Sequence, residues 1–206
     1  MRDAFVRRLL ASARKDPRIV LITGDLGFGV LDAFERELPK QYLNAGVAEQ
    51  NMTALATGMA LEGFVPFTYS IGNFCTLRCL EQLRNDAFYH DASVKVVCIG
   101  GGFTYGSLGM SHHATEDLSI LRALPNVCVM APANDYETDC AVEEIIRRPG
   151  PVYLRLERIS DASLDPGPSV PFEFARARCV RQGSDVTLIA TGGIVSEALL
   201  AAGQLQ

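Results

Sequence analysis

Short apolar runs alternate with longer amphipathic stretches over the first 158 residues of the chain. The runs are mostly apolar, without a regular alternation of apolar and polar residues, which is typical of strands that are buried on both faces of a parallel sheet. The stretches between them repeat apolar residues at helical spacing, as helices that cover a sheet do. The predicted strands are residues 18–23, 41–44, 65–69, 94–99, 127–130 and 152–156, and the predicted helices are 3–14, 48–62, 76–89, 118–124 and 135–148.

Local signals support several helix boundaries. Gly63 follows the helix at 48–62, where a glycine commonly ends a helix. The helix at 135–148 begins with an aspartate and ends with two arginines, which suits the helix dipole. The helix at 76–89 has four residues expected to face the core, Leu77, Leu80, Leu83 and Phe88.

This order of elements predicts an α/β fold, an open doubly wound parallel sheet with helices on both faces. Ligands bind such a fold at the carboxyl ends of its strands. We expect one domain over residues 1–159 and a proline- and glycine-rich linker over 160–182. Residues 183–206 then predict one strand, at 185–193, and the start of a helix. Such a pair cannot bury both of its faces alone, so it either packs on the first domain or opens a truncated second domain, and we favour truncation.

Composition narrows the function classes. The chain has 206 residues, 48% of them hydrophobic, and a net charge of −5, which argues against nucleic acid as the main partner. No apolar run approaches the roughly 18 residues of a membrane span. The charged N-terminus is not a signal peptide. The six cysteines have no metal-site or disulfide-framework spacing, so we expect reduced thiols in a cytoplasmic protein.

Common nucleotide and nucleophile motifs are absent. The glycine cluster after residues 94–99 fails the dinucleotide fingerprint because Tyr105 stands where its last glycine would be. There is no phosphate loop of the Walker type and no G-x-S-x-G elbow. Glu49 lies in the first turn of the helix at 48–62, among amides. A glutamate at a helix start is commonly structural, so this position alone leaves both interpretations open.

Several motifs in unbroken order resemble the pyrimidine-binding domain of the transketolase family and of deoxyxylulose phosphate synthases. The resemblance covers residues 3–158, and TGGIVSEALLAA at 191–202 is similar to the opening of that family's C-terminal domain. Each motif is weak alone, and their order and spacing make the resemblance specific. The motifs are GVAEQNM, EGFVPFTYS, FCTLRCLEQLRND, GMSHHATEDLSILRALPN, VMAPAND and PVYLRLER.

The resemblance implies a cofactor, thiamine diphosphate, with its pyrimidine half bound here. Glu49 matches the family's acid, which hydrogen-bonds the pyrimidine N1′ so that the 4′-amino group can act as a base. Phe74 matches the aromatic ring against the pyrimidine face, with Tyr69 nearby, and both are also compatible with core packing. Asp25 matches an acid that borders the cofactor, although a turn-forming role is equally open.

The same resemblance implies substrate contacts. Arg78 and Arg158 match arginines that bind sugar phosphate, and Arg155 is a neighbour of Arg158 near the same strand end. His112 matches the histidine that polarises the donor carbonyl and moves protons, and His113 stands where relatives usually have glutamine. His112 and Glu116 are also four apart, but no third metal ligand is apparent, so no metal site is predicted.

Two departures from the family pattern matter. Leu108 occupies the position of an aspartate that recognises an acceptor hydroxyl, so the acceptor is expected to differ. The Gly-Asp-Gly signature that precedes a Mg²⁺-binding asparagine is missing. We therefore expect Mg²⁺ and the diphosphate to be held by a second transketolase subunit or domain, in a dimer or heterotetramer.

The sequence thus predicts a subunit or fragment of a thiamine-diphosphate-dependent transketolase-like enzyme that is inactive without its missing half. It would transfer a two-carbon or acyl unit between small molecules. One alternative is the β subunit of a 2-oxoacid dehydrogenase E1 component. Another is an assembly subunit with the same fold and no activity.

Overall fold

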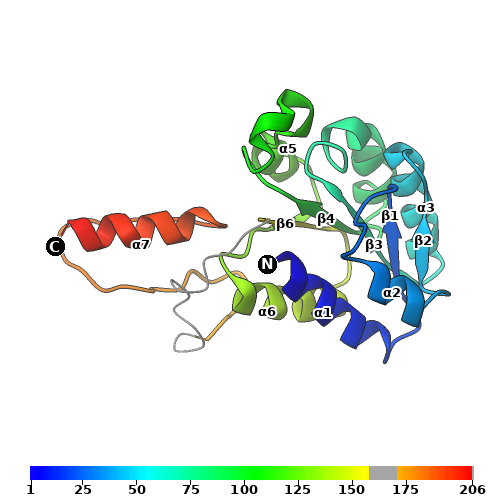
Figure 1. The fold of residues 1–206 in the computed structure, drawn as a ribbon, viewed down its shortest axis with the longest axis horizontal. Helices are drawn as coiled ribbons and strands as arrows, with labels where there is room; N and C mark the ends of the chain where they lie inside the picture. The colour runs from blue at the N-terminus through cyan, green and yellow to red at the C-terminus, as the bar shows by residue number, and fades with distance from the viewer. Residues whose placement is uncertain (158–170, 206) are drawn as a thin grey trace.

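The predicted parallel sheet is confirmed in a computed structural model that describes residues 1–157 and 171–205. Six parallel strands form the sheet in the order β2-β1-β3-β4-β6-β5 (Figure 1). Each strand lies at or within two residues of its predicted position. The strands are β1 (Ile19–Thr23), β2 (Tyr42–Asn44), β3 (Val65–Ile71), β4 (Lys95–Ile99), β5 (Cys128–Met130) and β6 (Val152–Leu156).

Helices cover both faces of this sheet, and each face has its own apolar cluster. One face carries α1 (Arg2–Ala13), α2 (Asp32–Glu37) and α6 (Asp135–Arg147). The other carries α3 (Glu49–Leu61), α4 (Leu80–Gln82) and α5 (Asp117–Arg122) (Figure 1). Every residue of β1 and β4 is buried, which explains why their sequences are mostly apolar. Burying each large aliphatic side chain contributes about 1.5–3 kcal/mol.

The strand order has its switch point at the carboxyl ends of β1 and β3. The chain pairs β2 on one side of β1 and then crosses to pair β3 on the other side. Where a parallel sheet reverses its winding in this way, the two outgoing loops diverge and leave room for a ligand. The loops after β1, β2 and β3 therefore border the position where a site is expected.

The single helix predicted over residues 76–89 is wrong. This segment consists of a 3₁₀ turn, η1 (Leu77–Cys79), then α4 and a π turn, η2 (Leu83–Phe88). Leu83 and Phe88 are buried as predicted, but Leu77 is 40% exposed. A 3₁₀ turn and a π turn rotate the chain by different amounts per residue, so residues at α-helical spacing no longer share one face.

The glycine-rich segment after β4 is more ordered than a plain loop. It contains two 3₁₀ turns, η3 (Gly106–Leu108) and η4 (Met110–His112). Gly102 and Ala114 form an antiparallel bridge, with N–H···O distances of 2.7 and 2.9 Å. This bridge closes residues 102–114 into a self-contained loop, which we call the β4 loop.

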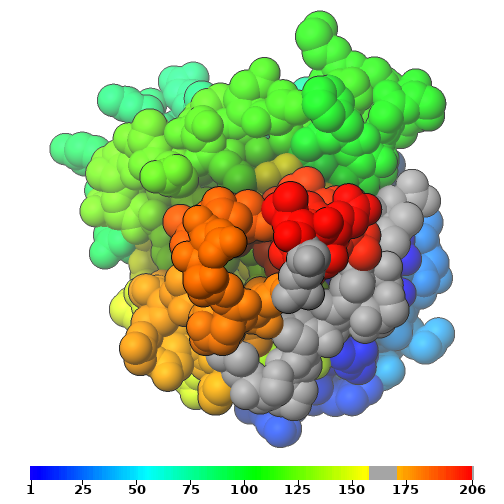
Figure 2. All heavy atoms as spheres, turned by 90° about the vertical axis from the view of Figure 1, so that its left-hand side faces the viewer, coloured from blue at the N-terminus to red at the C-terminus, as the bar shows by residue number. Residues whose placement is uncertain are grey.

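The strand predicted at residues 185–193 is also wrong. These residues form no strand, although α7 (Ile194–Gln204) follows as predicted. Gly192 N–H donates to the Ala131 carbonyl at 3.0 Å, but no neighbouring strand pairs with this segment in the described part of the chain. In Figure 1 α7 projects from the layers, and Figure 2 shows the C-terminal residues in orange and red across one face of the molecule. Unpaired backbone cannot form a strand by itself.

Candidate active site

Glu49 is a buried carboxylate at the carboxyl end of the sheet. It is the first residue of α3, and its side chain is only 2% exposed. Gly24, which follows β1, lies against it, since a Cβ built on Gly24 would be 3.5 Å from Glu49 Cγ. Arg78 Nη1 donates to Glu49 Oε2 over 2.9 Å. A negative charge is favourable at a helix N-terminus, and Arg78 supplies the second source of compensation.

Phe74 and His112 extend this group. Phe74 follows β3, and Arg78 Cζ lies 4.3 Å from the centroid of its ring. The His112 ring, on the β4 loop, lies 5.0 Å from the Phe74 ring, edge toward face. Four predicted residues, Glu49, Phe74, Arg78 and His112, are thus brought together from the segments that follow β2, β3 and β4. We call them the Glu49 cluster.

Two residues that the sequence did not single out fix the position of His112. Asn73 Nδ2 donates to the Ser111 carbonyl at 2.8 Å, which ties the end of β3 to the β4 loop. Ser111 Oγ lies 3.0 Å from His112 Nδ1, within hydrogen-bonding distance. Asn73 directly precedes Phe74, so the sequence signal for this contact was a polar residue shortly after the end of β3.

Asp25 lies beside the cluster and is held by Asn44. Its backbone N–H donates to Asn44 Oδ1, and Asn44 Nδ2 donates to Asp25 Oδ1, each at 3.0 Å. Asp25 has a φ of 58°, in the left-handed region that aspartate tolerates better than most residues. The turn-forming interpretation therefore describes its backbone, while its side chain is exposed and bonded to Asn44.

Tyr69 is not brought to the Glu49 cluster. Its ring stacks on Phe5 of α1 at 6.0 Å, and it belongs to the apolar cluster on the α1 face. Alternate residues of a strand point to opposite faces, and Tyr69 shares its face with Phe67. Burial raises the pKa of the Tyr69 phenol above its usual value, which fits a core position.

His113 is engaged within its own loop, whereas Leu108 is open to solvent. His113 Nε2 donates to the Gly106 carbonyl at 3.1 Å, and its ring meets Phe103 at 5.0 Å. Leu108 is 55% exposed on η3. The residue that departs from the family pattern thus lies on the surface of the loop that carries His112.

Arg155 forms a buried ion-pair network, and Arg158 lies outside the described residues. Arg155 Nε is 3.4 Å from Asp117 Oδ2 and 3.8 Å from Glu157 Oε1. Tyr153 Oη donates to Asp117 Oδ2 at 2.6 Å, and burial raises the pKa of this phenol well above its usual value. The sequence had no signal for this network, because its members come from α5 and the end of β6.

The Arg155 network supports the base of the β4 loop. A Cβ built on Gly101 would lie 1.8 Å from Arg155 Nε, so only glycine leaves room for that side chain. Thr104 Oγ1 donates to Glu157 Oε2 at 2.8 Å. The three consecutive glycines at 100–102 could have indicated this close approach.

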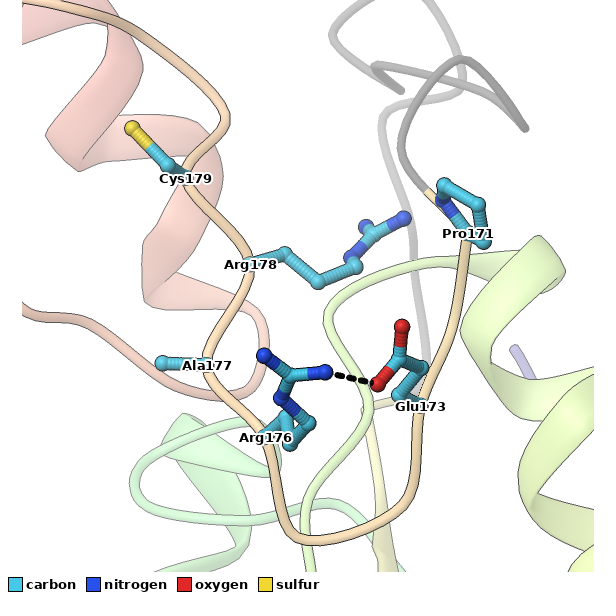
Figure 3. A pocket seen from close by; sticks show the side chains of 6 residues that line it. All are labelled: Pro171, Glu173, Arg176, Ala177, Arg178 and Cys179. Carbon is cyan, nitrogen blue, oxygen red and sulfur yellow. Dashed lines mark hydrogen bonds and ion pairs between the residues drawn. The ribbon is translucent and has the colours of Figure 1, made fainter.

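Other features of the described residues are separate from the cluster. A hollow on residues 171–179 is lined by Glu173, Arg176 and Arg178 and contains none of the predicted site residues (Figure 3). Within residues 1–157 and 171–205, no group of three or more His, Cys, Asp or Glu is placed to hold a metal ion. No helix in those ranges is long and apolar enough to cross a membrane.

Comparison with known families agrees with this architecture. Residues 1–160 match the family described as transketolase, pyrimidine binding domain. The chain therefore belongs to the transketolase pyrimidine-binding domain family.

Two relatives show the range of proteins to which the chain is similar. It is 37% identical over 206 residues to the 6-deoxy-6-sulfo-D-fructose transketolase subunit SqwH of Clostridium sp. (strain MSTE9), covering 100% of this chain and 64% of the relative. It is 34% identical to the 1-deoxy-D-xylulose-5-phosphate synthase of Synechococcus sp. (strain RCC307), covering 98% of this chain and 32% of the relative. The chain thus spans at most about two thirds of these proteins.

A solved structure shares almost the whole described fold. It is a split gene transketolase described as an inactive beta4 tetramer. The TM-score is 0.88 at 33% identity, covering 99% of this chain and 66% of that one.

Proposed function

We propose that the chain is the pyrimidine-binding part of a thiamine-diphosphate-dependent transketolase-like enzyme. Residues 1–159 would form this domain, 160–182 a linker, and 183–206 the opening of a C-terminal domain. The reaction would transfer a two-carbon or acyl unit from a donor to a carbonyl acceptor. The observation that carries the proposal is the buried Glu49 carboxylate at the carboxyl end of the sheet, next to Phe74 and His112.

The donor set of the Glu49 cluster suits an aminopyrimidine ring. A carboxyl group can hydrogen-bond a ring nitrogen, and an aromatic face can stack on the ring. Thiamine diphosphate, when bound, would supply a nucleophilic carbon at C2 of its thiazolium ring. A buried site favours this chemistry, since exclusion of water strengthens the hydrogen bonds around it.

Six residues of the chain have a defined role in this proposal. Glu49 would exchange a proton with the ring nitrogen, and Phe74 would orient the ring. His112 would hydrogen-bond the donor carbonyl and move a proton to or from it. Asp25 would border the cofactor. His113 and Arg158 would contact the substrate, as the family resemblance implies.

A second polypeptide or domain would complete the site. The similarity to a protein named as a transketolase subunit supports this expectation, as does the share of that relative that the chain covers. The proposed partner would hold the diphosphate through Mg²⁺. The assembly would be a dimer or a heterotetramer.

The test is Glu49→Gln in the protein purified together with its partner. Calorimetry with thiamine diphosphate and Mg²⁺ measures binding, and turnover is measured over a panel of ketose and 2-oxoacid donors. We expect binding to change only a few-fold, because an amide fills the same space. Turnover should fall by about 10²–10⁴-fold, the usual range for loss of a proton-transfer group.

Glu62→Gln is the matched control, since Glu62 is exposed at the other end of α3. It should leave both measurements unchanged. Full turnover in Glu49→Gln would refute the role of Glu49. Failure of the assembled wild-type protein to bind thiamine diphosphate would refute the cofactor.

A further inference from the structure

The guanidinium of Arg78 already has partners within the chain, unlike that of an arginine whose role is to bind a substrate phosphate. Its guanidinium is hydrogen-bonded to Glu49 Oε2 at 2.9 Å and also lies over the Phe74 ring. Its side chain is 45% exposed, whereas that of Glu49 is 2% exposed. One end of the pair is thus fixed in the interior and the other reaches the surface.

The surroundings of Glu49 make this pair its main charge compensation. The titratable groups shown to act on Glu49 are Arg78 and Cys79 of η1. His112 lies across the Phe74 ring, and Asp25 follows Gly24 and is bonded to Asn44. Burial raises the pKa of the Cys79 thiol to about 11, and the Glu49 charge adds to this effect. Cys79 is therefore a neutral thiol at pH 8 and does not compensate the Glu49 charge. Among the described residues, Glu49 forms an ion pair with Arg78 alone.

We infer that Arg78 is a positioning residue that serves as the internal counter-ion of Glu49. It keeps the buried carboxylate ionised before the cofactor binds, and its stacking on Phe74 fixes the carboxylate relative to that ring. An isolated charge in such a position is costly, so loss of Arg78 would favour the neutral form of the carboxyl group. This inference assigns Arg78 to the cofactor acid instead of to substrate phosphate. The consequence for cofactor binding, described next, rests on the proposed function.

Proton uptake is the consequence for cofactor binding. An ionised Glu49 can only accept a hydrogen bond, and an unprotonated ring nitrogen can only accept one as well. Binding must therefore bring one proton from solvent to be shared between Glu49 and the ring nitrogen. If Arg78 is removed, the neutral form of Glu49 is favoured before binding, so binding should take up fewer protons than in wild type.

The first experiment needs no cofactor. A double-mutant cycle measures the urea midpoint of the full chain at pH 8 for wild type, Arg78→Met, Glu49→Gln and the double variant. We expect Arg78→Met to lower the midpoint clearly, and to lower it much less in the Glu49→Gln background. The exposed Arg14–Glu37 pair, tested as Arg14→Met and Glu37→Gln, is the control and should show little coupling. Additive effects of the Arg78 and Glu49 substitutions would overturn the inference.

The second experiment counts protons in the assembled protein. Calorimetry of thiamine diphosphate binding at pH 8, with Mg²⁺ and in two buffers of different ionisation enthalpy, gives the number taken up. We expect about one proton per site for wild type and Arg78→Lys, and clearly fewer for Arg78→Met. Equal uptake in wild type and Arg78→Met would overturn the inference. Absence of binding by wild type would refute the proposed function, and the double-mutant cycle would still decide the role of Arg78.

Discussion

At the scale of single residues, position 101 shows how space selects glycine. The φ of Gly101 is not positive, so its backbone conformation is open to any residue. A Cβ there would nevertheless lie 1.8 Å from Arg155 Nε and 2.2 Å from its Cζ. Arg155 is held by Asp117 and Glu157 and cannot move aside freely. The glycine therefore lets the β4 loop rest directly on a buried guanidinium.

We expect Gly101→Ala to lower the free energy of unfolding by about 1–3 kcal/mol, the usual cost of inserting a methyl group into packed surroundings. Urea denaturation of the full chain measures this loss. Gly106→Ala is the control, because Gly106 is exposed and a Cβ there would meet nothing within 4 Å. Equal stability of the two variants would contradict the packing described here.

Leu108 provides a prediction about specificity that depends on the proposed function. An aspartate at this exposed position could accept a hydrogen bond from an acceptor hydroxyl, which leucine cannot do. Leu108→Asp should therefore raise kcat/KM for hydroxyaldehyde acceptors by about tenfold relative to acceptors without the hydroxyl. Met110→Asp, on the same loop and 86% exposed, controls for added charge. An unchanged ratio for Leu108→Asp would mean that η3 does not contact the acceptor.

At the scale of elements, Lys95 joins the start of β4 to the end of α6. Its side chain is fully buried, and Nζ donates to the carbonyls of Arg148 and Gly150, each at 2.7 Å. A cation is favourable at a helix C-terminus, where carbonyl groups lack partners. Burial first, and then the positive charge of Arg148, lowers the pKa of Lys95 from 10.5 to about 8.

This lowered pKa has a defined effect on stability. Between pH 8 and 10.5 the unfolded chain holds the proton that the folded chain has lost, so stability rises with pH in this range. The free energy of unfolding of wild type minus that of Lys95→Met should therefore grow by about 3 kcal/mol from pH 7 to 10.5. Subtracting the two free energies of unfolding cancels the contribution of tyrosine and cysteine ionisation, because both proteins share it. Lys40→Met, at an exposed lysine, is the control, and a flat difference for Lys95→Met would contradict the prediction.

The elements also show what could be predicted from the sequence. Buried parallel strands have mostly apolar sequences, so β1, β4 and β6 were identifiable, and so were the loops that follow the strands. Asp25, Glu49, Phe74 and His112 all lie on such loops or at the helix start that follows one. The family resemblance singled these residues out, and their positions agree with the fold rule that ligands bind at the carboxyl ends of the strands.

The remaining features depend on tertiary contacts. The 3₁₀ and π turns of residues 77–88 and the six-residue α2 have no periodicity long enough to recognise. The Glu49–Arg78 ion pair joins residues 29 positions apart, and the Asp117–Tyr153 hydrogen bond joins residues 36 apart. Residues 185–193 have the composition of a strand, but pairing needs a neighbour that the described chain does not provide.

At the scale of the whole molecule, several large apolar side chains are exposed on the same edge of the sheet as the Glu49 cluster. They lie on the loops that follow β1, β2 and β4, at the carboxyl end of the sheet. Their members are Phe28, Val47, Phe103, Leu108 and Met110, and we call them the apolar rim. Large apolar side chains gathered around a site are typical of a surface that another protein covers. In the proposed assembly, the subunit or domain that carries the diphosphate site would cover them.

The last prediction tests that surface. Burying one large apolar side chain contributes about 1.5–3 kcal/mol, and 1.4 kcal/mol corresponds to tenfold in Kd. Met110→Gln and Phe28→Gln should each weaken association with the co-purified partner by about tenfold or more, as measured by calorimetry or surface plasmon resonance. Leu61→Gln is the control, because Leu61 is also exposed but ends α3, where the chain turns toward the amino end of β3. Hydrogen exchange in the complex should slow in the β4 loop and remain unchanged around Leu61. If all three variants bound equally well and the β4 loop stayed unprotected, the partner would have to bind another face, and the Glu49 cluster would remain uncovered at the carboxyl end of the sheet.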